Sequence, residues 1–183
     1  KSPVKIKIIG DKSLSKRDFS RVIDPLKKFG VSFFPKNRKN LPLFLKSNKP
    51  LKPINYLENK GSAQCKSSIM FAALNVSGKT KIKAKKSRDH TEIIFKYLGV
   101  PIKVKKTKSY DFIEIKGPTT IKTLDYSIPS DISSAAFFLV LTTLSKKSKL
   151  LIKQVNINPT RSGVILILKK MGAKILLKNK KNY

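Results

Sequence analysis

The order of apolar and polar residues predicts alternating strands and helices. Residues 3–9 alternate apolar side chains with lysines, which is typical of a half-buried strand. Two runs, 69–74 and 135–144, are almost wholly apolar and predict helices buried in a core. Short apolar segments between turn residues predict further strands at 31–34, 43–45, 54–57, 80–84, 102–105, 112–115, 124–128, 150–155 and 173–177.

Polar residues predict where most of the helices begin. Ser62 is placed to cap the first apolar helix, and Asp131 the second. A surface helix is predicted after Asp89, with Glu92 three residues on as the reciprocal partner of a capping box. A last helix is expected to open at Asn158, where the following proline suits a first helical position.

The amino-terminal helix contains a proline. Ser15 can cap a short helix that Pro25 is expected to break. Asp24 would then cap a second helix, which Gly30 ends.

Similar sequences recur about every 70 residues. The segments L-K-K-F-G-V, F-K-Y-L-G-V and L-K-K-M-G-A place glycines at 30, 99 and 172, and the apolar helices begin at Ser62 and Ser133. Each predicted unit contains a strand, a buried helix, a strand, a surface helix and further strands. The sequence therefore predicts an α/β fold made of repeated units, of which 183 residues hold fewer than three.

The charge of the chain is strongly positive, formally +31. Lysine supplies 36 of the 41 basic residues and is spread over the whole length, while Trp is absent. This distribution favours compositional bias and solubility over a nucleic-acid-binding surface, so no specific nucleic acid is expected as a partner. Weak, non-specific binding to polyanions still follows from the charge.

Few residues are available for metal or covalent chemistry. Cys65 and His90 are the only residues of their types, so neither a disulfide nor a metal site is predicted, and no cofactor is implied. Cys65 lies where a helix dipole could activate it, although a small buried side chain is the favoured interpretation. The longest apolar run is too short to span a membrane, and no targeting peptide is evident; a lone cysteine favours a reducing, cytoplasmic compartment.

Helix starts and scarce arginines indicate an oxyanion ligand. The hydroxyl of Ser62, the amide of Gln64 and the free N–H groups of a helix start suit a phosphate. Arg17, Arg88 and Arg161 stand near predicted helix starts, and arginine grips carboxylates and phosphates bidentately. Two structural alternatives stay open, an ordinary capped core helix and arginine–aspartate ion pairs at helix starts.

Five segments in register give the chain a family resemblance. They are G-D-K-S-L-S-K-R at 10–17, S-A-Q-C-K-S-S at 62–68, S-R-D-H-T-E at 87–92, D-I-S-S-A-A-F-F-L at 131–139 and N-P-T-R-S-G at 158–163. Together they closely resemble the enolpyruvyl transferase family, in particular its shikimate-specific bacterial members with S-A-Q. The resemblance implies a two-lobed, inside-out α/β barrel of β-α-β-α-β-β units, with residues 1–126 in the first lobe and 127–183 opening the second.

The resemblance also implies an activity and its binding residues. Members transfer the enolpyruvyl group of phosphoenolpyruvate to the 5-hydroxyl of shikimate 3-phosphate. By motif position, Ser62, Ala63, Gln64 and Arg88 would hold shikimate 3-phosphate. Arg17 would bind phosphoenolpyruvate, with Gln64 close to both substrates. The expected protein is a cytoplasmic monomer.

Departures from the family pattern limit these expectations. Asp18 replaces the usual proline and could draw Arg17 into an ion pair. The family's catalytic acid/base groups would lie outside these 183 residues, so the chain is expected to be an inactive internal fragment without catalytic residues. Asp131 falls near the expected crossover between lobes, and Arg161 is expected to be structural. UDP-N-acetylglucosamine enolpyruvyl transferase, whose cysteine loop is not found, and a non-catalytic polyanion-binding protein are the alternatives.

Overall fold

The computed structural model describes residues 4–47 and 50–179. It divides into two compact units, Lys1–Lys122 (unit 1) and Thr123–Tyr183 (unit 2). Unit 1 contains β1 (Val4–Ile8), η1 (Leu14–Lys16), α1 (Ser20–Phe29), β2 (Ser32–Phe34), β3 (Leu43–Ser47), β4 (Asn55–Glu58), α2 (Ala63–Ala73), β5 (Gly78–Lys85), α3 (His90–Tyr97), β6 (Ile102–Lys106) and β7 (Tyr110–Gly117). Unit 2 contains α4 (Ile132–Leu144) and α5 (Gly163–Lys170).

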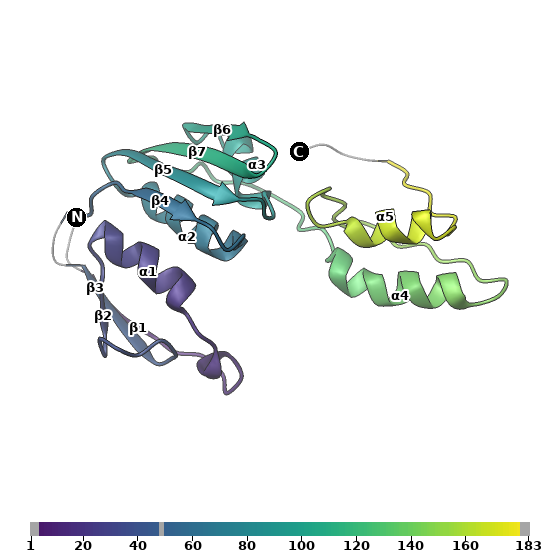
Figure 1. Ribbon diagram of the computed structural model, residues 1–183, viewed down its shortest axis with the longest axis horizontal. Coiled ribbons are helices and arrows are strands. Elements are labelled where there is room, and N and C mark those ends of the chain that lie inside the picture. Colours follow the sequence, from purple (N-terminus) through teal and green to yellow (C-terminus); the bar gives the residue numbers. More distant parts are fainter. Residues whose placement is uncertain (1–3, 48–49, 180–183) are drawn as a thin grey trace. The chain divides into compact units, whose positions relative to one another are not determined.

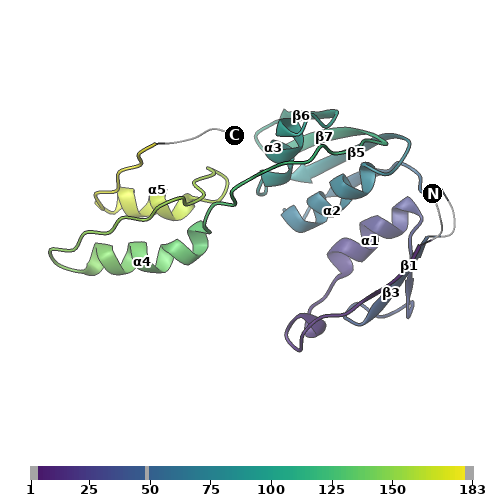
Figure 2. The same ribbon diagram turned by 180° about the vertical axis from the view of Figure 1, so that it is seen from behind.

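Unit 1 holds two sheets with α1 and α2 between them (Figures 1 and 2). The smaller sheet has the order β1-β3-β2 and is antiparallel. The larger sheet has the order β4-β5-β7-β6, in which β4 and β5 are parallel and the other pairs antiparallel. The segment from β4 to β7 is thus one complete β-α-β-α-β-β unit, as the sequence predicts.

The main core lies where α2 and α3 cover one face of the larger sheet. Ile69 and Met70 of α2 are fully buried against Ile82 of β5, Ile115 of β7 and Phe95 of α3. The alternation of β5, with threonine, isoleucine and alanine inward and lysines outward, sends every second side chain into this core. This arrangement confirms the predicted buried helix and places its first turn at the edge of the core.

The three repeated glycines confirm the predicted helix ends. Gly30, Gly99 and Gly172 all have positive φ, at 106°, 70° and 96°. Each follows a helix at the position where a left-handed residue ends it, which glycine adopts without a Cβ penalty.

Pro25 does not break α1, contrary to the prediction. The helix runs from Ser20 to Phe29 through Pro25, and Asp24 is no cap. Ile23, Pro25 and Phe29 are buried, so the packing of this face stabilises the helix despite the missing backbone donor.

Two predicted helix starts are also wrong in detail. Asp89 does precede α3, but its side chain makes no capping bond; it pairs with Lys106, while Glu92 pairs with Lys66 instead of closing a capping box. The last helix begins at Gly163, because Asn158 caps a separate turn through Thr160. In each case a tertiary or turn contact takes the side chain that the local motif would have used.

Unit 2 contains fewer elements than predicted. Among its described residues, segments 124–128, 150–155 and 173–177 form no strands, and a single bridge joins Ser130 to Val155. A strand requires a ladder of hydrogen bonds to a neighbour, and in the described part of the chain the pairing of segment 150–155 is limited to this bridge. Helix α4 is present and capped by Asp131, but only Ile132 and Ala135 of it are buried, so the prediction of a buried second helix is wrong here.

Candidate functional site

The first turn of α2 is held in place by local hydrogen bonds. Ser62 has extended backbone geometry and caps the helix, its Oγ accepting from the N–H of Cys65 at 3.2 Å. The buried carboxylate of Glu58 accepts from the N–H groups of Lys60 and Gly61 at 3.0 and 2.9 Å. The turn between β4 and α2 is therefore fixed before any ligand binds.

This turn presents unpaired backbone donors. Within the described parts of the chain, the N–H groups of Ala63 and Gln64 have no hydrogen-bond partner. Ser62 and Ala63 are half-buried, and Gln64 is exposed. Free N–H groups at a helix start, with the positive end of the helix dipole, attract an anion.

Arg21 of α1 holds the side chain of Gln64. Its Nη1 donates to Gln64 Oε1 at 3.1 Å, which leaves the Gln64 amide nitrogen as a donor. The sequence interpretation missed Arg21 as a site residue. The scarcity of arginine that pointed to Arg17 and Arg88 applies equally to Arg21 and could have identified it.

Arg17 lies at the end of η1 with an exposed side chain. In the residues that the structure describes, no ion pair joins it to Asp18. Asp18 instead accepts from the N–H of Ser20 at 2.6 Å, and hydrogen bonding to Ser20 lowers the pKa of Asp18. The ion pair that Asp18 could have made with Arg17 is therefore not formed.

Arg88 lies in the connection between β5 and α3. Its neighbours are fixed, since Lys86 pairs with Asp111 and Asp89 with Lys106, both at 2.6 Å. The hydrogen bond to Asp89 raises the pKa of Lys106. Arg88 itself is exposed and has no ion pair or hydrogen bond to another described residue, so its guanidinium is available to a ligand.

The structure links some of the predicted site residues and not others. Ser62, Ala63 and Gln64 share one helical turn, and contacts of the following turn join α2 to the start of α3, just after Arg88. No contact among the described residues joins Arg17 to this group. The roles given to these residues remain predictions.

Cys65 is not an activated nucleophile. Its side chain is buried, and burial raises the pKa of its thiol, outweighing a hydrogen bond with Tyr56 that would lower it. Burial, with the neighbouring Cys65, also raises the pKa of Tyr56 to about 12. The interpretation of Cys65 as a buried structural side chain is confirmed.

Asp131 and Arg161 form a structural contact in unit 2. Arg161 Nη2 lies 2.8 and 3.0 Å from the two carboxylate oxygens of Asp131 and 3.0 Å from Ser133 Oγ. Asp131 also accepts from the N–H of Ser133; this bond, followed by Arg161, lowers the pKa of Asp131. Here the arginine–aspartate alternative holds, and Arg161 serves to fix the start of α4.

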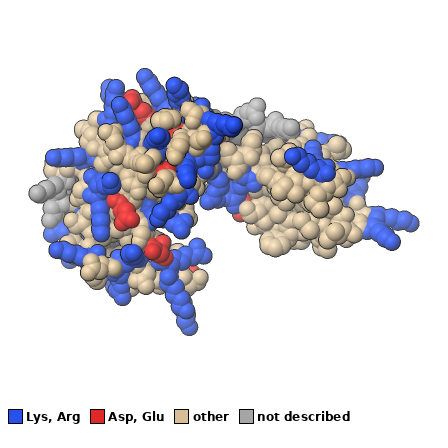
Figure 3. All heavy atoms as spheres, viewed as in Figure 1, with Lys and Arg blue, Asp and Glu red and all other residues tan. Residues whose placement is uncertain are grey.

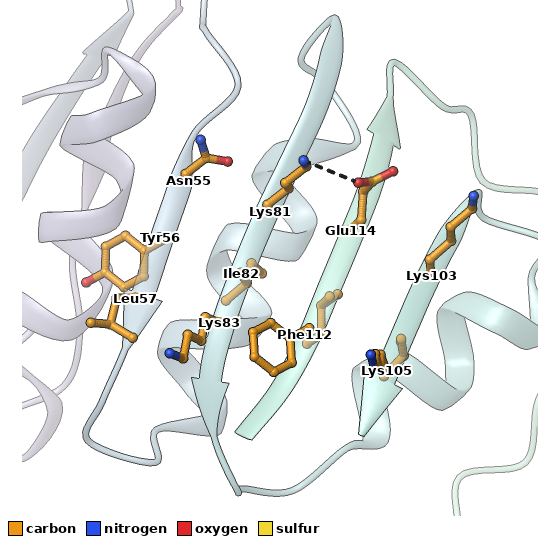
Figure 4. Close-up of a pocket in the computed structure, with 12 residues that line it drawn as sticks. Asn55, Tyr56, Leu57, Lys81, Ile82, Lys83, Lys103, Lys105, Phe112 and Glu114 are labelled. Atoms are coloured by element: carbon orange, nitrogen blue, oxygen red, sulfur yellow. Dashed lines mark ion pairs between the residues drawn. The ribbon is translucent and has the colours of Figure 1, made fainter. Parts of the chain in front are cut away.

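A hollow of about 610 Å³ lies elsewhere, on the outer face of the larger sheet (Figure 4). Lysines 81, 83, 103 and 105 and Phe112 line it, and none of the predicted site residues does. Figure 3 shows lysine and arginine side chains over both units. The α2 turn is the stronger candidate for an anion site, because it combines unpaired donors with arginines, whereas this sheet face is shallow and solvated.

The described residues contain no group of three or more metal-ligating side chains close enough to hold an ion. None of their helices has both the length and the hydropathy to cross a membrane.

Comparison with known proteins gives consistent matches along the chain. The family model of EPSP synthase (3-phosphoshikimate 1-carboxyvinyltransferase) matches residues 1–182. The 3-phosphoshikimate 1-carboxyvinyltransferase of Petrotoga mobilis is 45% identical over 95% of this chain and 40% of the relative, and that of Caldicellulosiruptor bescii is 44% identical over 96% and 41%. The structure of EPSP synthase from Acinetobacter baumannii superposes with a TM-score of 0.80 at 35% identity, covering 97% of this chain and 39% of that one. The chain therefore spans about two fifths of the length of these relatives.

Proposed function

The chain belongs to the EPSP synthase family, and on this premise we propose that it binds the shikimate-side substrate of an enolpyruvyl transferase. The whole protein would transfer the enolpyruvyl group of phosphoenolpyruvate to the 5-hydroxyl of shikimate 3-phosphate and release phosphate. Ser62, Ala63, Gln64 and Arg88 would bind shikimate 3-phosphate. Arg17 and Gln64 would contact phosphoenolpyruvate.

The observation that carries this proposal is the prepared first turn of α2. Its unpaired N–H groups, the Gln64 amide held by Arg21 and the unpaired guanidinium of Arg88 supply donors for a phosphorylated anion. Both proposed substrates are such anions. The names of the relatives favour shikimate 3-phosphate over a UDP-sugar acceptor.

Several whole-protein properties belong to the same proposal. Residues 1–126 would form most of the substrate-binding lobe and 127–183 the start of the second lobe. The protein would act as a cytoplasmic monomer, and the buried, unpaired thiol of Cys65 agrees with a reducing compartment.

A binding titration tests the proposal directly. Calorimetry on the 183-residue chain should detect shikimate 3-phosphate binding that is tighter than binding of inorganic phosphate at equal ionic strength. The same titration with single-stranded DNA tests the polyanion alternative. Equal affinity for phosphate and shikimate 3-phosphate, together with steeply salt-dependent DNA binding, would overturn the proposal in favour of that alternative.

The 183-residue chain should bind without turning over. The acid/base groups that the family uses are expected outside it, so the measured rate of phosphate release from both substrates should stay at the buffer blank. Product formation by the purified chain would contradict this expectation.

A further inference from the structure

A buried ion pair joins the two helices that follow the candidate binding residues. Lys66 of α2 and Glu92 of α3 meet at 2.5 Å between Nζ and Oε1, with side-chain exposures of 0% and 4%. Within the described chain, neither Lys66 Nζ nor the carboxylate oxygens of Glu92 have a hydrogen-bond partner, so the two side chains meet as an ion pair alone. Each charge therefore depends on the other for its compensation in a water-free environment.

The pair belongs to a set of contacts that hold the segment from Lys86 to Glu92. Next to the pair, Ser67 Oγ and Thr91 Oγ1 lie 2.7 Å apart, a second link between α2 and α3. On the sheet side, Lys86 pairs with Asp111, and Asp89 with Lys106. The segment is thus fastened to α2 by two contacts and to the sheet by two, while Arg88 in its middle remains unpaired.

Stability alone does not account for this arrangement. Burying two charges costs more than their attraction usually returns, and apolar side chains of similar volume are often equally stable there. Around the pair, α2 and α3 already pack through an apolar core that includes Ile69 and Phe95. What a buried ion pair adds over an apolar contact is a fixed attachment point, because moving either charge away from the other leaves an uncompensated charge in the core.

We propose that Lys66 and Glu92 are positioning residues for the binding site, holding Arg88 at a fixed place relative to Ser62–Gln64. Lys66 follows Gln64 by two residues and Glu92 follows Arg88 by four, so the pair joins the helix that carries Gln64 to the segment that carries Arg88. This inference rests on the proposed binding of shikimate 3-phosphate for its consequence, but the link itself is testable without that ligand.

The main variant replaces both charges by methionine, Lys66→Met with Glu92→Met. Methionine keeps an unbranched chain of similar volume but makes only adaptable, non-directional contacts. The matched control is Lys79→Met with Glu114→Met, which removes a partly exposed ion pair at 3.7 Å on the outer sheet face, together with the 3.9 Å contact of Glu114 with Lys81. Glu92→Asp is the second variant; it keeps both charges but shortens the reach of the carboxylate, and it serves if the first variant does not fold.

Three measurements on the 183-residue chain test the positioning role of Lys66 and Glu92. The melting temperature of the double variant should equal or exceed that of the control, because the desolvation cost is removed. Amide exchange of residues 86–92 should rise at least about tenfold, while the sheet stays protected. Affinity for shikimate 3-phosphate should fall about tenfold, as expected when one charged partner is misplaced. A purely structural role predicts instead that affinity follows the melting temperature.

Unchanged exchange and affinity in the double variant, or in Glu92→Asp if the double variant is unfolded, would overturn the proposal. Increased exchange with unchanged affinity would also overturn the positioning role. If the unaltered chain does not bind shikimate 3-phosphate, the proposed function fails, whereas the exchange of residues 86–92 still shows whether the pair fixes this segment.

Discussion

At the scale of single residues, the site depends on how a few polar groups are presented. Gln64 has an exposed side chain that would rotate freely by itself, and Arg21 from another helix holds its oxygen. Sequence motifs identify Gln64 but not its partner, since 43 positions separate the two. Because Arg21 binds the amide oxygen of Gln64, the amide nitrogen of this exposed side chain is held in one orientation as a donor.

Replacing Arg21 should weaken ligand binding without unfolding the chain. We expect Arg21→Ala to lower the affinity for shikimate 3-phosphate about fivefold, because Gln64 loses a hydrogen bond to a charged group worth about 1 kcal/mol. Calorimetry checks this, with Arg38→Ala as the control, another exposed arginine whose Nη1 contacts the Pro42 carbonyl. An equal effect of the two substitutions would show that only overall charge matters.

Cys65 should make the chain less stable in alkali. Its pKa is raised above the ordinary value of 9.0, so above pH 9 the unfolded chain loses the thiol proton while the folded chain retains it. The unfolded state then binds fewer protons, and stability, fully present below pH 9, falls as pH rises through the folded pKa. Tyr56, raised from 10.0 to about 12, adds the same trend above pH 10.

Urea unfolding at pH 8.0 and 9.8 measures this effect. Cys65→Ala should reduce the loss of stability between these two values, because pH 9.8 lies above the ordinary pKa of a thiol, 9.0, and still below that of a phenol, 10.0. A loss of the same size in the variant and in the unaltered chain would exclude Cys65 as its cause.

At the scale of elements, the repeat is most visible where helices end, and the backbone conformation of a single glycine determines each of these ends. Glycine at 30, 99 and 172 could be predicted from the sequence because a left-handed residue is required by the backbone itself. The capping box predicted at Asp89 and Glu92 does not form, because both carboxylates pair with lysines on other elements. A local motif cannot reveal such distant partners. Pro25 within α1 shows the same dependence on packing.

Gly99→Ala should destabilise unit 1 by about 1 kcal/mol, because alanine is strained at positive φ. A Cβ at this position would meet no atom within 4 Å, so backbone strain is the whole effect. Gly163→Ala is the control: it lies in the first turn of α5, has equally open surroundings and no positive φ. Thermal unfolding should show a lower melting temperature for Gly99→Ala and no decrease for Gly163→Ala. An equal decrease for both variants would contradict backbone strain as the cause.

At the scale of the whole molecule, the two units differ in how they use apolar helices. Helix α2 is enclosed by a sheet and α3, whereas α4 exposes Phe137, Phe138, Leu141 and Leu144 at 60–78%. The apolar stretches of the two helices, 69–74 and 135–144, look alike, since each is apolar on nearly all sides. Helix α2 is buried because other elements cover it, whereas most of α4 is exposed because no described element covers it there. The sequence of neither helix shows whether such a covering layer is present.

The exposed face of α4 should bind the dye ANS. We expect the 183-residue chain to enhance ANS fluorescence at neutral pH, because contiguous apolar surface of this kind is uncommon on folded proteins. Phe138→Ser with Leu141→Ser should reduce the signal, and Lys146→Ser, just beyond the end of α4, should not. Fluorescence unaffected by the double substitution would place the dye elsewhere.

The sequence by itself determined most elements of unit 1, the repeat, the ends of its helices and the family, because these follow from periodicity, caps and motif order within short stretches. The tertiary structure alone decided that Arg21 holds Gln64, that Lys66 meets Glu92 and that the segments predicted as strands in unit 2 form no ladder among the described residues. The physical reason is that a charge, an amide or a strand edge is satisfied by whichever partner folding brings to it. That partner lies far away in the chain, beyond what a local pattern records.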